Sequence, residues 1–466
     1  MTIHSLLARS RDTLMRALLL LLSAILLPAC VVASTHSQVE RVVAISDVHG
    51  AYDSMVRTLL AAGIVGEDLA WAADATHLVI TGDLLDRGAD SRKVMDLIMQ
   101  LEEEALQSGG QVHLLLGNHE VMNLIGDLRY VAKGEYAAFA EDESAEDRER
   151  WFQRYFDTLG SEEDEATARA SFNELAPPGF FAHRRAFAAD GHYGKWLLEK
   201  PLIAVINRTA FVHGGLPPLV AELGLDGIND KLGAELSTYT REVNVLNDAG
   251  LLSPIVNFYD HPDAILNFPL DPMRSQEVMD AGKLVQELHE SSINSPDGPL
   301  WYRGTVGCGP LVESERLDAA LGALGADRVV IGHTPTLTRQ VLQRLGGRVI
   351  EIDTGMLQSA YNGVGNALLL EGDQLSVVNE VTGADATIVK HPRRVGLRAE
   401  KLSAEDLARA LRSGEILATR TDEQKRTFVD LEENGQTITA EFIKNPRGKG
   451  FVPELAAYRL DLMLDL

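Results

Sequence analysis

One short stretch near the start of the chain joins an apolar run to two ligand-type side chains. In "VVAISDVHG", residues 42–50, Asp47 and His49 stand one residue apart and are followed by Gly50. A carboxylate and an imidazole at alternate positions can converge on one metal ion if the backbone turns at the glycine. Alone, such a pair is more often a loop cap or a hydrogen-bonded core pair than a metal site.

Four more polar clusters follow apolar runs further along the chain. Their candidate residues are Asp83, Asp86 and Arg87 of "GDLLDRG", Asn118 and His119 of "GNHE", His213 of "HGG", and His333 of "GHTP". By itself "GDLLDRG" could be no more than a salt-bridged turn. Five clusters of this kind together indicate a shared site, because carboxylate, amide and imidazole ligands suit two borderline-to-hard metal ions.

The other histidines that we considered lack such surroundings. His77 and His113 lie beside predicted strands, and no ligand-rich cluster surrounds the remaining ones: His183, His192, His261, His289 and His391. We therefore expect these seven histidines to be structural.

Short buried strands must position the five clusters. The apolar runs cover residues 41–46, 77–81, 112–116, 209–212 and 328–331. Continuous apolar runs are typical of strands covered on both faces, and in layered α/β folds ligands collect beyond the carboxyl ends of the strands. Between the strands, residues 53–65 and 91–106 show helical spacing of apolar residues. The sequence thus predicts a layered α/β fold with one site built from five loops.

The ordered series of motifs resembles the calcineurin-like metallophosphoesterases. "GDLLDRG" and "GNHE" are similar to motifs of the phosphoprotein phosphatase branch, while "GNHEVMNLIGDLRYV" and "PLWYRG" resemble the Shewanella-like phosphatases, a group with tyrosine-directed members. The resemblance extends over roughly residues 39–391. It implies a layered β-sandwich core flanked by helices.

The resemblance also implies a dinuclear metal centre. In the first position an ion would be held by Asp47, His49 and Asp83; in the second, by Asp83, Asn118, His213 and His333. Two divalent or trivalent ions, of manganese, iron or zinc, suit these ligands, and the sequence does not distinguish among the three metals. In such sites a hydroxide that bridges the ions attacks the phosphoryl group.

The remaining roles concern the leaving group and the phosphate. The resemblance implies that His119, oriented by Asp86, protonates the departing oxygen. Arg87 and Arg303, the latter from "PLWYRG", would grip the phosphate with their planar guanidinium groups, and Asn118 would contact it as well as a metal.

Hydrolysis of phosphomonoesters on a phosphorylated protein, at phosphotyrosine or at phosphoserine and phosphothreonine, is the activity that the resemblance implies. A broad extracytoplasmic phosphomonoesterase acting on small phosphoesters is one alternative. A dinucleoside polyphosphate hydrolase shares all five motifs and would prefer pyrophosphate bonds. A non-catalytic binding module is disfavoured, because every implied ligand and His119 are present.

Composition excludes other classes of function. The 466 residues include 43 Lys+Arg against 68 Asp+Glu, for a net charge of -25, which opposes any sequence-independent binding to nucleic acid. The cysteines are Cys30 and Cys308 alone, so a disulfide framework and a thiolate zinc cluster are both excluded.

The N-terminus is typical of an exported protein. An apolar run at residues 17–27 follows three arginines, and we interpret residues 1–33 as a signal peptide. "LPAC" resembles a lipoprotein box, in which Cys30 would carry a lipid anchor to the membrane, whereas plain cleavage would follow Ala33. An uncleaved anchor is disfavoured, since the run is about half the length of a spanning helix. We expect a periplasmic protein or a membrane-anchored lipoprotein.

Two further regions flank or interrupt the main domain. An acidic helical insert is expected at about residues 134–200, with an aromatic stripe at residues 151–156 packed inward; a partner-binding surface is the alternative. A small C-terminal α+β appendage is expected at residues 396–466, with a helix over residues 403–416, a hairpin around Asn434 and Gly435, and a helix over residues 452–466. A truncated partner-binding module is the alternative. The sequence leaves the oligomeric state open.

Overall fold

A computed structural model describes most of the chain. It covers residues 35–159, 164–268, 275–382, 385–386, 388–390, 415–421, 427–433 and 436–442. The predicted signal peptide, residues 1–33, lies outside these ranges. Within them, none of the helices combines the length and the apolar character that crossing a membrane requires.

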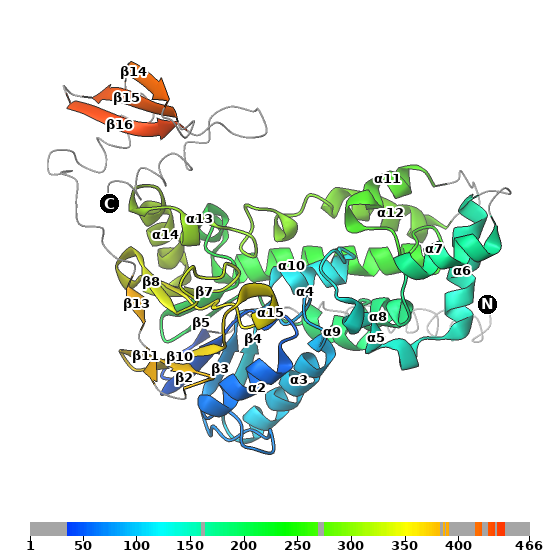
Figure 1. Cartoon of the computed structure of the whole chain (residues 1–466), viewed down its shortest axis with the longest axis horizontal. Coiled ribbons are helices and arrows are strands. Elements are labelled where there is room, and N and C mark those ends of the chain that lie inside the picture. The colour runs from blue at the N-terminus through cyan, green and yellow to red at the C-terminus, as the bar shows by residue number, and fades with distance from the viewer. Residues whose placement is uncertain are drawn as a thin grey trace, which may run out of the picture.

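Two β-sheets form the core of the molecule (Figure 1). The six-stranded sheet has the order β12(Asp385–Ala386), β11(Gln374–Asn379), β10(Asn366–Glu371), β2(Arg41–Ile45), β3(His77–Ile80), β4(Gln111–Leu114). The seven-stranded sheet has the order β1(Thr35–His36), β5(Ile203–Ile206), β6(Thr209–Val212), β7(Arg328–Ile331), β9(Val349–Glu351), β8(Leu342–Arg344), β13(Val389–Lys390). The predicted layered β-sandwich is therefore confirmed.

The side chains of β2 point alternately to the two faces of its sheet, and this shows how the layers are held together. Val42 and Ala44 belong to the apolar cluster between the two sheets, which also contains Phe211 and Ile350 of the seven-stranded sheet. Val43 and Ile45 point the other way, into the larger cluster shared with the helices. Because both faces of the strand are buried, its sequence is continuously apolar, as the sequence analysis expects.

Helices cover the outer faces of the sandwich. Beside the six-stranded sheet lie α2(Tyr52–Ala61) and α3(Ser91–Gln107), while α4(Asn118–Ile125) lies beside the next helix described (Figure 1). A long helix, α10(Pro218–Asp248), bends at Gly224, which has a φ of 67°. The other elements after α10 are η2(Phe258–Asp260), α11(His261–Leu266), α12(Gln276–Leu288), η3(Ser292–Asn294), α13(Gly304–Gly307), α14(Pro310–Leu324), η4(Leu345–Gly347) and α15(Gln358–Tyr361).

The chain between α4 and β5 forms what we call the helical segment. It contains α5(Lys133–Ala137), η1(Ala140–Asp142), α6(Ala145–Leu159), α7(Glu165–Leu175), α8(Phe180–Ala186) and α9(His192–Leu198). Phe152 of α6, Phe172 of α7 and Phe181 of α8 pack in one aromatic cluster, against which Tyr155 and Phe156 also lie. The acidic face of α6 thus has an apolar face beneath it.

A three-stranded antiparallel sheet lies near the C-terminus, with strands β14(Glu415–Thr421), β15(Thr427–Glu433) and β16(Gln436–Phe442). Glu433 pairs with Gln436, so β15 and β16 are joined as the hairpin that the sequence predicts. The predicted helix over residues 403–416 is wrong at its end, because Glu415 and Ile416 begin β14. The rest of that helix, and the one predicted over residues 452–466, lie outside the described ranges.

Candidate metal centre

Five loops at one end of the sandwich carry nine of the ten predicted site residues, and the tenth, Arg303, directly precedes α13. The loops follow β2, β3, β4, β6 and β7, and they bring these side chains together: Asp47, His49, Asp83, Asp86, Arg87, Asn118, His119, His213 and His333. Seven of the nine are buried, His333 is half-buried and Arg87 is exposed. Burial of so many polar groups is costly unless they are paired or bind metal.

An unusual backbone conformation marks these loops. Six of the predicted site residues have positive φ: Asp47 (48°), His49 (48°), Asp83 (56°), Asp86 (70°), Arg87 (68°) and His333 (68°). Non-glycine residues rarely adopt this region, and when they do they cluster at functional sites, at a cost of about 1–3 kcal/mol each. Five of the six are Asp or His, which are among the non-glycine residues that adopt this region most often, so the residue types permit these turns without specifying them.

Two glycines of the motifs are required because neighbouring parts of the chain approach them too closely for a side chain to fit. Gly82 has a φ of 93°, and a Cβ atom there would collide with the backbone of Gly117. A Cβ atom at Gly332 would collide with the Asp47 carboxylate. The glycines that precede Asp83 and His333 therefore let neighbouring loops pack closely enough for their side chains to meet.

Asp83 lies at the centre of the cluster. Its Oδ2 atom is 3.3 Å from Nε2 of His213, 3.7 Å from Nε2 of His49 and 3.8 Å from Nε2 of His119. Its Oδ1 atom accepts a hydrogen bond of 3.0 Å from the His119 backbone N–H. Two groups of three ligand atoms, each within 4.8 Å, share Asp83: one with His49 and His119, the other with His213 and His333.

His213 links Asp83 to two further candidate ligands. Its Nε2 atom is 2.9 Å from Oδ1 of Asn118 and 3.2 Å from Nδ1 of His333. Its Nδ1 atom donates to the backbone oxygen of Thr81 at 2.8 Å, a contact that leaves Nε2 directed at the centre. The buried Nε2 atom of His333 has no hydrogen-bond partner. Nε2 of His213 thus has hydrogen-bond partners in the cluster, whereas Nε2 of His333 is left without one.

Asp47 is placed beside the centre but outside both groups of three. Its carboxylate accepts hydrogen bonds from the Ser46 hydroxyl and from the His333 backbone N–H, the latter at 3.0 Å and 3.1 Å to its two oxygens. Its Oδ1 atom is 4.0 Å from Nε2 of His49. His119, to which the sequence analysis assigns proton transfer, stands instead in a group with His49 and Asp83.

His119 and Asp86 form a hydrogen-bonded pair. Nδ1 of His119 is 2.5 Å from Oδ2 of Asp86, and Oδ1 of Asp86 accepts a bond of 3.0 Å from the Asn123 side chain. The carboxylate is therefore fixed on both sides, and it orients the imidazole so that Nε2 faces Asp83. This is the arrangement of a positioned acid or base.

The electrostatics of the centre depend on the Asp83 carboxylate. Burial acts to raise its pKa, but His213 and His119 outweigh burial and hold the pKa well below the usual range. In return, burial acts to lower the pKa of His213, and Asp83 raises it to about 9. The two groups behave as a tightly coupled pair in which negative charge is retained on Asp83. Such a charge attracts cations into the cluster.

Arg87 lies on the open side of the centre between two tyrosine rings. Its guanidinium carbon is 5.0 Å from the ring centroid of Tyr130 and 5.3 Å from that of Tyr361. One guanidinium nitrogen donates to the Tyr361 hydroxyl and lies 2.8 Å from Nε2 of His49. Partial burial lowers the pKa of Arg303, whereas Tyr130 and Asp83 act to raise it.

Three residues of the site received no role in the sequence analysis. Glu120 accepts backbone hydrogen bonds of 2.8 Å from Asp83, Leu84 and Gly117, and so ties two site loops together. Burial, followed by Asp83, raises its pKa to about 7. Glu120 is the last residue of the "GNHE" motif, and its place in that motif is the sequence signal that could have assigned it to the site. Tyr130 lies in the stretch "GNHEVMNLIGDLRYV", which gives it no role by itself, and no sequence pattern marks Tyr361.

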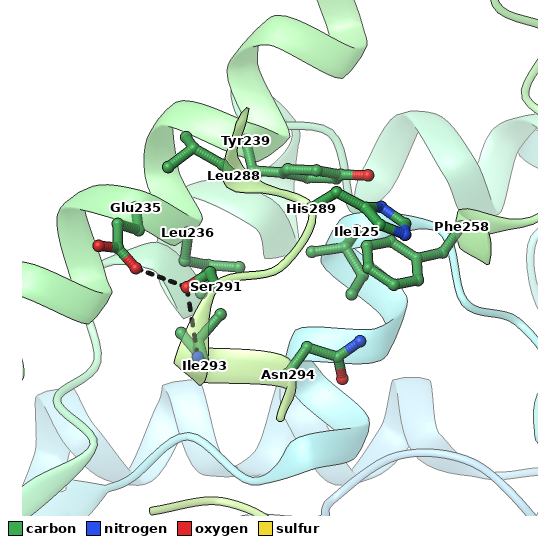
Figure 2. A pocket seen from close by; sticks show the side chains of 10 residues that line it. All are labelled: Ile125, Glu235, Leu236, Tyr239, Phe258, Leu288, His289, Ser291, Ile293 and Asn294. Carbon is green, nitrogen blue, oxygen red and sulfur yellow. Dashed lines mark hydrogen bonds between the residues drawn. The ribbon is translucent and has the colours of Figure 1, made fainter. Parts of the chain in front are cut away.

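A separate pocket lies away from this centre, between α4, α10 and α12 (Figure 2). Its lining contains none of the predicted site residues. There the Phe258 and His289 rings stack with centroids 4.3 Å apart, and the Ser291 hydroxyl donates to Glu235 at 2.5 Å. Nδ1 of His289 is buried without a hydrogen-bond partner, but no carboxylate or second imidazole ligand group of the kind found at the strand ends is grouped with it in the described residues.

Comparison with known proteins yields related phosphatases. The family model described as calcineurin-like phosphoesterase matches residues 40–337. An uncharacterized protein of Schizosaccharomyces pombe is 30% identical over 349 residues, which span 73% of this chain and 80% of that protein. Shewanella-like protein phosphatase 2 of Arabidopsis thaliana is 33% identical over 207 residues, 41% of this chain and 51% of that protein.

Among solved structures, a cold-active protein-tyrosine phosphatase of a psychrophilic Shewanella species is similar to this chain. The TM-score is 0.50 at 27% sequence identity, and the alignment covers 76% of this chain and 82% of the Shewanella protein.

Proposed function

Since the chain belongs to the calcineurin-like phosphoesterase family and is thus a metal-dependent phosphatase, we propose that it removes phosphate from phosphoproteins and prefers phosphotyrosine. The family match and the phosphatase relatives support the class of enzyme. The similar Shewanella protein is a protein-tyrosine phosphatase. For this chain, the preference for tyrosine depends on the aromatic walls described below.

The donor set fits a dinuclear metal centre. Buried oxygen and imidazole groups converge within 4.8 Å in two groups that share Asp83, and the buried Nε2 atom of His333 lacks any other partner. We assign one ion to Asp47, His49 and Asp83, and the other to Asp83, Asn118, His213 and His333. When bound, two ions of this kind would activate water and neutralise phosphoryl charge. Manganese, iron and zinc all suit these ligands, and the metal content of the purified protein distinguishes among them.

His119 holds the proton for the leaving group. The Asp86 carboxylate fixes Nδ1, so the free Nε2 atom points toward the cluster around Asp83. Burial acts to lower the pKa of His119, whereas Asp83 and Asp86 raise it above its ordinary value. A protonated imidazole at this place can donate to a departing alkoxide or phenoxide.

Arg87 and Arg303 bind the phosphate from the open side. In the structure Arg87 contacts Nε2 of His49, and coordination by that nitrogen would displace the guanidinium toward the opening between Tyr130 and Tyr361. There its planar fork can grip two phosphoryl oxygens. Asn118 is available to the phosphate as well as to a metal.

The observation that carries the tyrosine preference is the pair of aromatic rings beside this opening. Tyr130 is 40% exposed, and its ring centroid is 5.2 Å from that of His119. Tyr361 faces it across Arg87, with its centroid 5.6 Å from that of His49. A phenyl phosphate can stack against such walls while its phosphate reaches the buried residues, whereas a seryl phosphate has no ring to stack.

The test compares phosphotyrosine and phosphoserine peptides of one sequence, with diadenosine tetraphosphate as a third substrate. We expect kcat/KM with added manganese to be at least about tenfold higher for phosphotyrosine, which corresponds to the roughly 1.4 kcal/mol of one favourable aromatic contact. Tyr130→Ala should remove most of this preference, and Tyr130→Phe should keep it because the ring remains. Equal rates on both peptides would refute the preference, and a faster reaction with the dinucleotide would refute the phosphoprotein activity.

Export is a separate proposal, supported by the sequence of residues 1–33 alone. Mass spectrometry of the mature N-terminus tests it. A lipidated Cys30 would indicate a membrane-anchored lipoprotein, a terminus at Ser34 would indicate a periplasmic protein, and an intact Met1 would overturn export.

A further inference from the structure

Three histidines meet between the two sheets, away from the candidate metal centre. His36 ends β1 of the seven-stranded sheet, whereas His77 begins β3 and His113 lies in β4 of the six-stranded sheet. From the sequence, His77 and His113 are expected to be structural, and nothing in it brings His36 to them. Only the stacking of the two sheets does so.

Strand register places this cluster at the end of the sandwich opposite the site loops. β3 starts at His77 and delivers its site loop at its other end. His36 pairs with Ile206, and Ile206 pairs with Thr209, the first residue of β6, whose site loop again follows the far end. No candidate site residue therefore belongs to this cluster.

The three rings lie as close together as rings of the candidate centre. Their centroids are 4.7 Å apart for His36 and His113, 4.9 Å for His77 and His113, and 5.2 Å for His36 and His77. For comparison, the centroids of His213 and His333 are 4.9 Å apart. Nε2 of His113 is already 2.9 Å from Nδ1 of His77. The buried Nε2 atom of His36 has no hydrogen-bond partner.

We propose that His36, His77 and His113 bind a divalent transition-metal ion, with Zn²⁺ as the probe, and that this ion fastens β1 to the opposite sheet. Imidazole is a favoured ligand of Zn²⁺, and three protein ligands with a water molecule complete a tetrahedral site. β1 has only two paired residues, Thr35 and His36, so a metal bond would add substantially to its attachment.

Coordination requires one ring to turn. Among the described residues, only the two groups at the candidate centre already offer three ligand atoms within 4.8 Å of one another. The His36 ring can turn about χ2, a torsion with broad minima, and its Nε2 atom gives up no hydrogen bond in doing so. A half-turn of an imidazole ring exchanges the positions of its nitrogens and carbons, so such a turn can direct a nitrogen where a carbon now lies.

The protonation state of the cluster supports metal binding. Burial lowers the pKa of His36, and burial together with neighbouring histidines lowers those of His77 and His113, the last to about 3. All three are then neutral at pH 7, which is the form that binds metal. A purely structural cluster would leave Nε2 of His36 buried and unsatisfied, which is unfavourable.

The test counts zinc ions on the full chain after removal of metals and equilibrium dialysis against Zn²⁺. We expect His36→Gln to bind one ion fewer than the wild type, and the matched control His192→Gln, at an exposed histidine of the helical segment, to bind the full number. Asp83→Asn, which disturbs the candidate centre, should retain the ion at the three histidines, so the outcome does not depend on the phosphatase proposal.

A second measurement uses the melting temperature. Zn²⁺ should raise the Tm of the Asp83→Asn protein, and the rise should disappear in Asp83→Asn combined with either His36→Gln or His77→Gln. The proposal is overturned if folded His36→Gln binds as many zinc ions as the wild type, or if the zinc-dependent rise in Tm survives both histidine replacements.

Discussion

The candidate metal centre and the helical segment of α5–α9 are built in opposite ways. At the centre, six polar or charged residues hold positive φ angles and most of the side chains are buried polar groups. In the described residues of the helical segment, no residue other than glycine has positive φ, and the interior is a cluster of aromatic rings. One region stores strain and buried charge, whereas the other gains free energy from apolar burial.

The difference shows where function and stability lie in the molecule. Strained backbone persists only when the surrounding structure holds it in place. Here the hydrogen bonds from Glu120 and the tight contact at Gly82 supply that constraint. The helical segment meets the centre through Glu135, whose carboxylate accepts a hydrogen bond of 3.4 Å from the Asp86 backbone N–H. Changes inside each region should therefore separate activity from stability.

The largest expected effect is at Asp83. Asp83→Asn keeps the size of the side chain and an oxygen that can accept from the His119 N–H, but it removes the charge between the two groups of ligands. Bound metal ions stabilise the charge of the transition state by several kcal/mol, so we expect kcat/KM to fall roughly 10⁴-fold when the metals are lost. Steady-state kinetics and metal content by mass spectrometry measure the effect. Full activity together with full metal content would contradict the role of Asp83.

In the helical segment the corresponding change is Phe152→Ala. Phe152 is fully buried and packs edge-on against Phe172 with ring centroids 5.4 Å apart. Removing the ring should cost about 3–5 kcal/mol of unfolding free energy, measured by urea denaturation. The folded protein should retain its kcat on p-nitrophenyl phosphate.

Leu175→Ala is the control for Phe152, because Leu175 lies in the same segment with 52% of its surface exposed. It should change stability by less than about 0.5 kcal/mol. If Phe152→Ala lowered kcat on the small substrate as strongly as it lowered stability, the separation of the two regions would be wrong.

Within the centre itself, His119→Ala separates proton donation to the leaving group from metal binding. We expect kcat to fall about 10²-fold on a phosphoserine peptide, because the leaving alkoxide needs a proton. The loss should be smaller on p-nitrophenyl phosphate, whose leaving group is stable as an anion. Metal content should stay unchanged. Loss of one ion in His119→Ala would instead make His119 a ligand, consistent with its group with His49 and Asp83.

The smallest expected effect concerns the start of α7. The Asp164 side chain accepts a hydrogen bond of 3.1 Å from the Thr167 N–H and caps the helix. Asp164→Ala should lower the unfolding free energy by about 1 kcal/mol, and Asp164→Asn, which still caps, by only a few tenths. Thermal denaturation measures both. A measurable loss of kcat in Asp164→Ala would indicate that the segment communicates with the centre.

Local patterns determined much of the sandwich and the membership of the centre. The strands β2, β3, β4, β6 and β7 are recognisable because burial on both faces requires continuous apolar residues. The polar residues at their ends are recognisable because their types suit metal and phosphate. The hairpin of β15 and β16 follows likewise from a short turn between two alternating stretches. In each case the physical cause acts within a few neighbouring residues.

Only the tertiary structure decided which groups meet across long separations. Tyr361 reaches Arg87, and His36 reaches His77 and His113, through the packing of loops and sheets that no local pattern encodes. The same packing placed Asp47 against the His333 backbone and His119 beside Asp83. Residue types in short motifs determine what chemistry is available to this chain, because ligation and proton transfer depend on functional groups. Distances between those groups depend on how the two sheets stack, and that is a property of the whole fold.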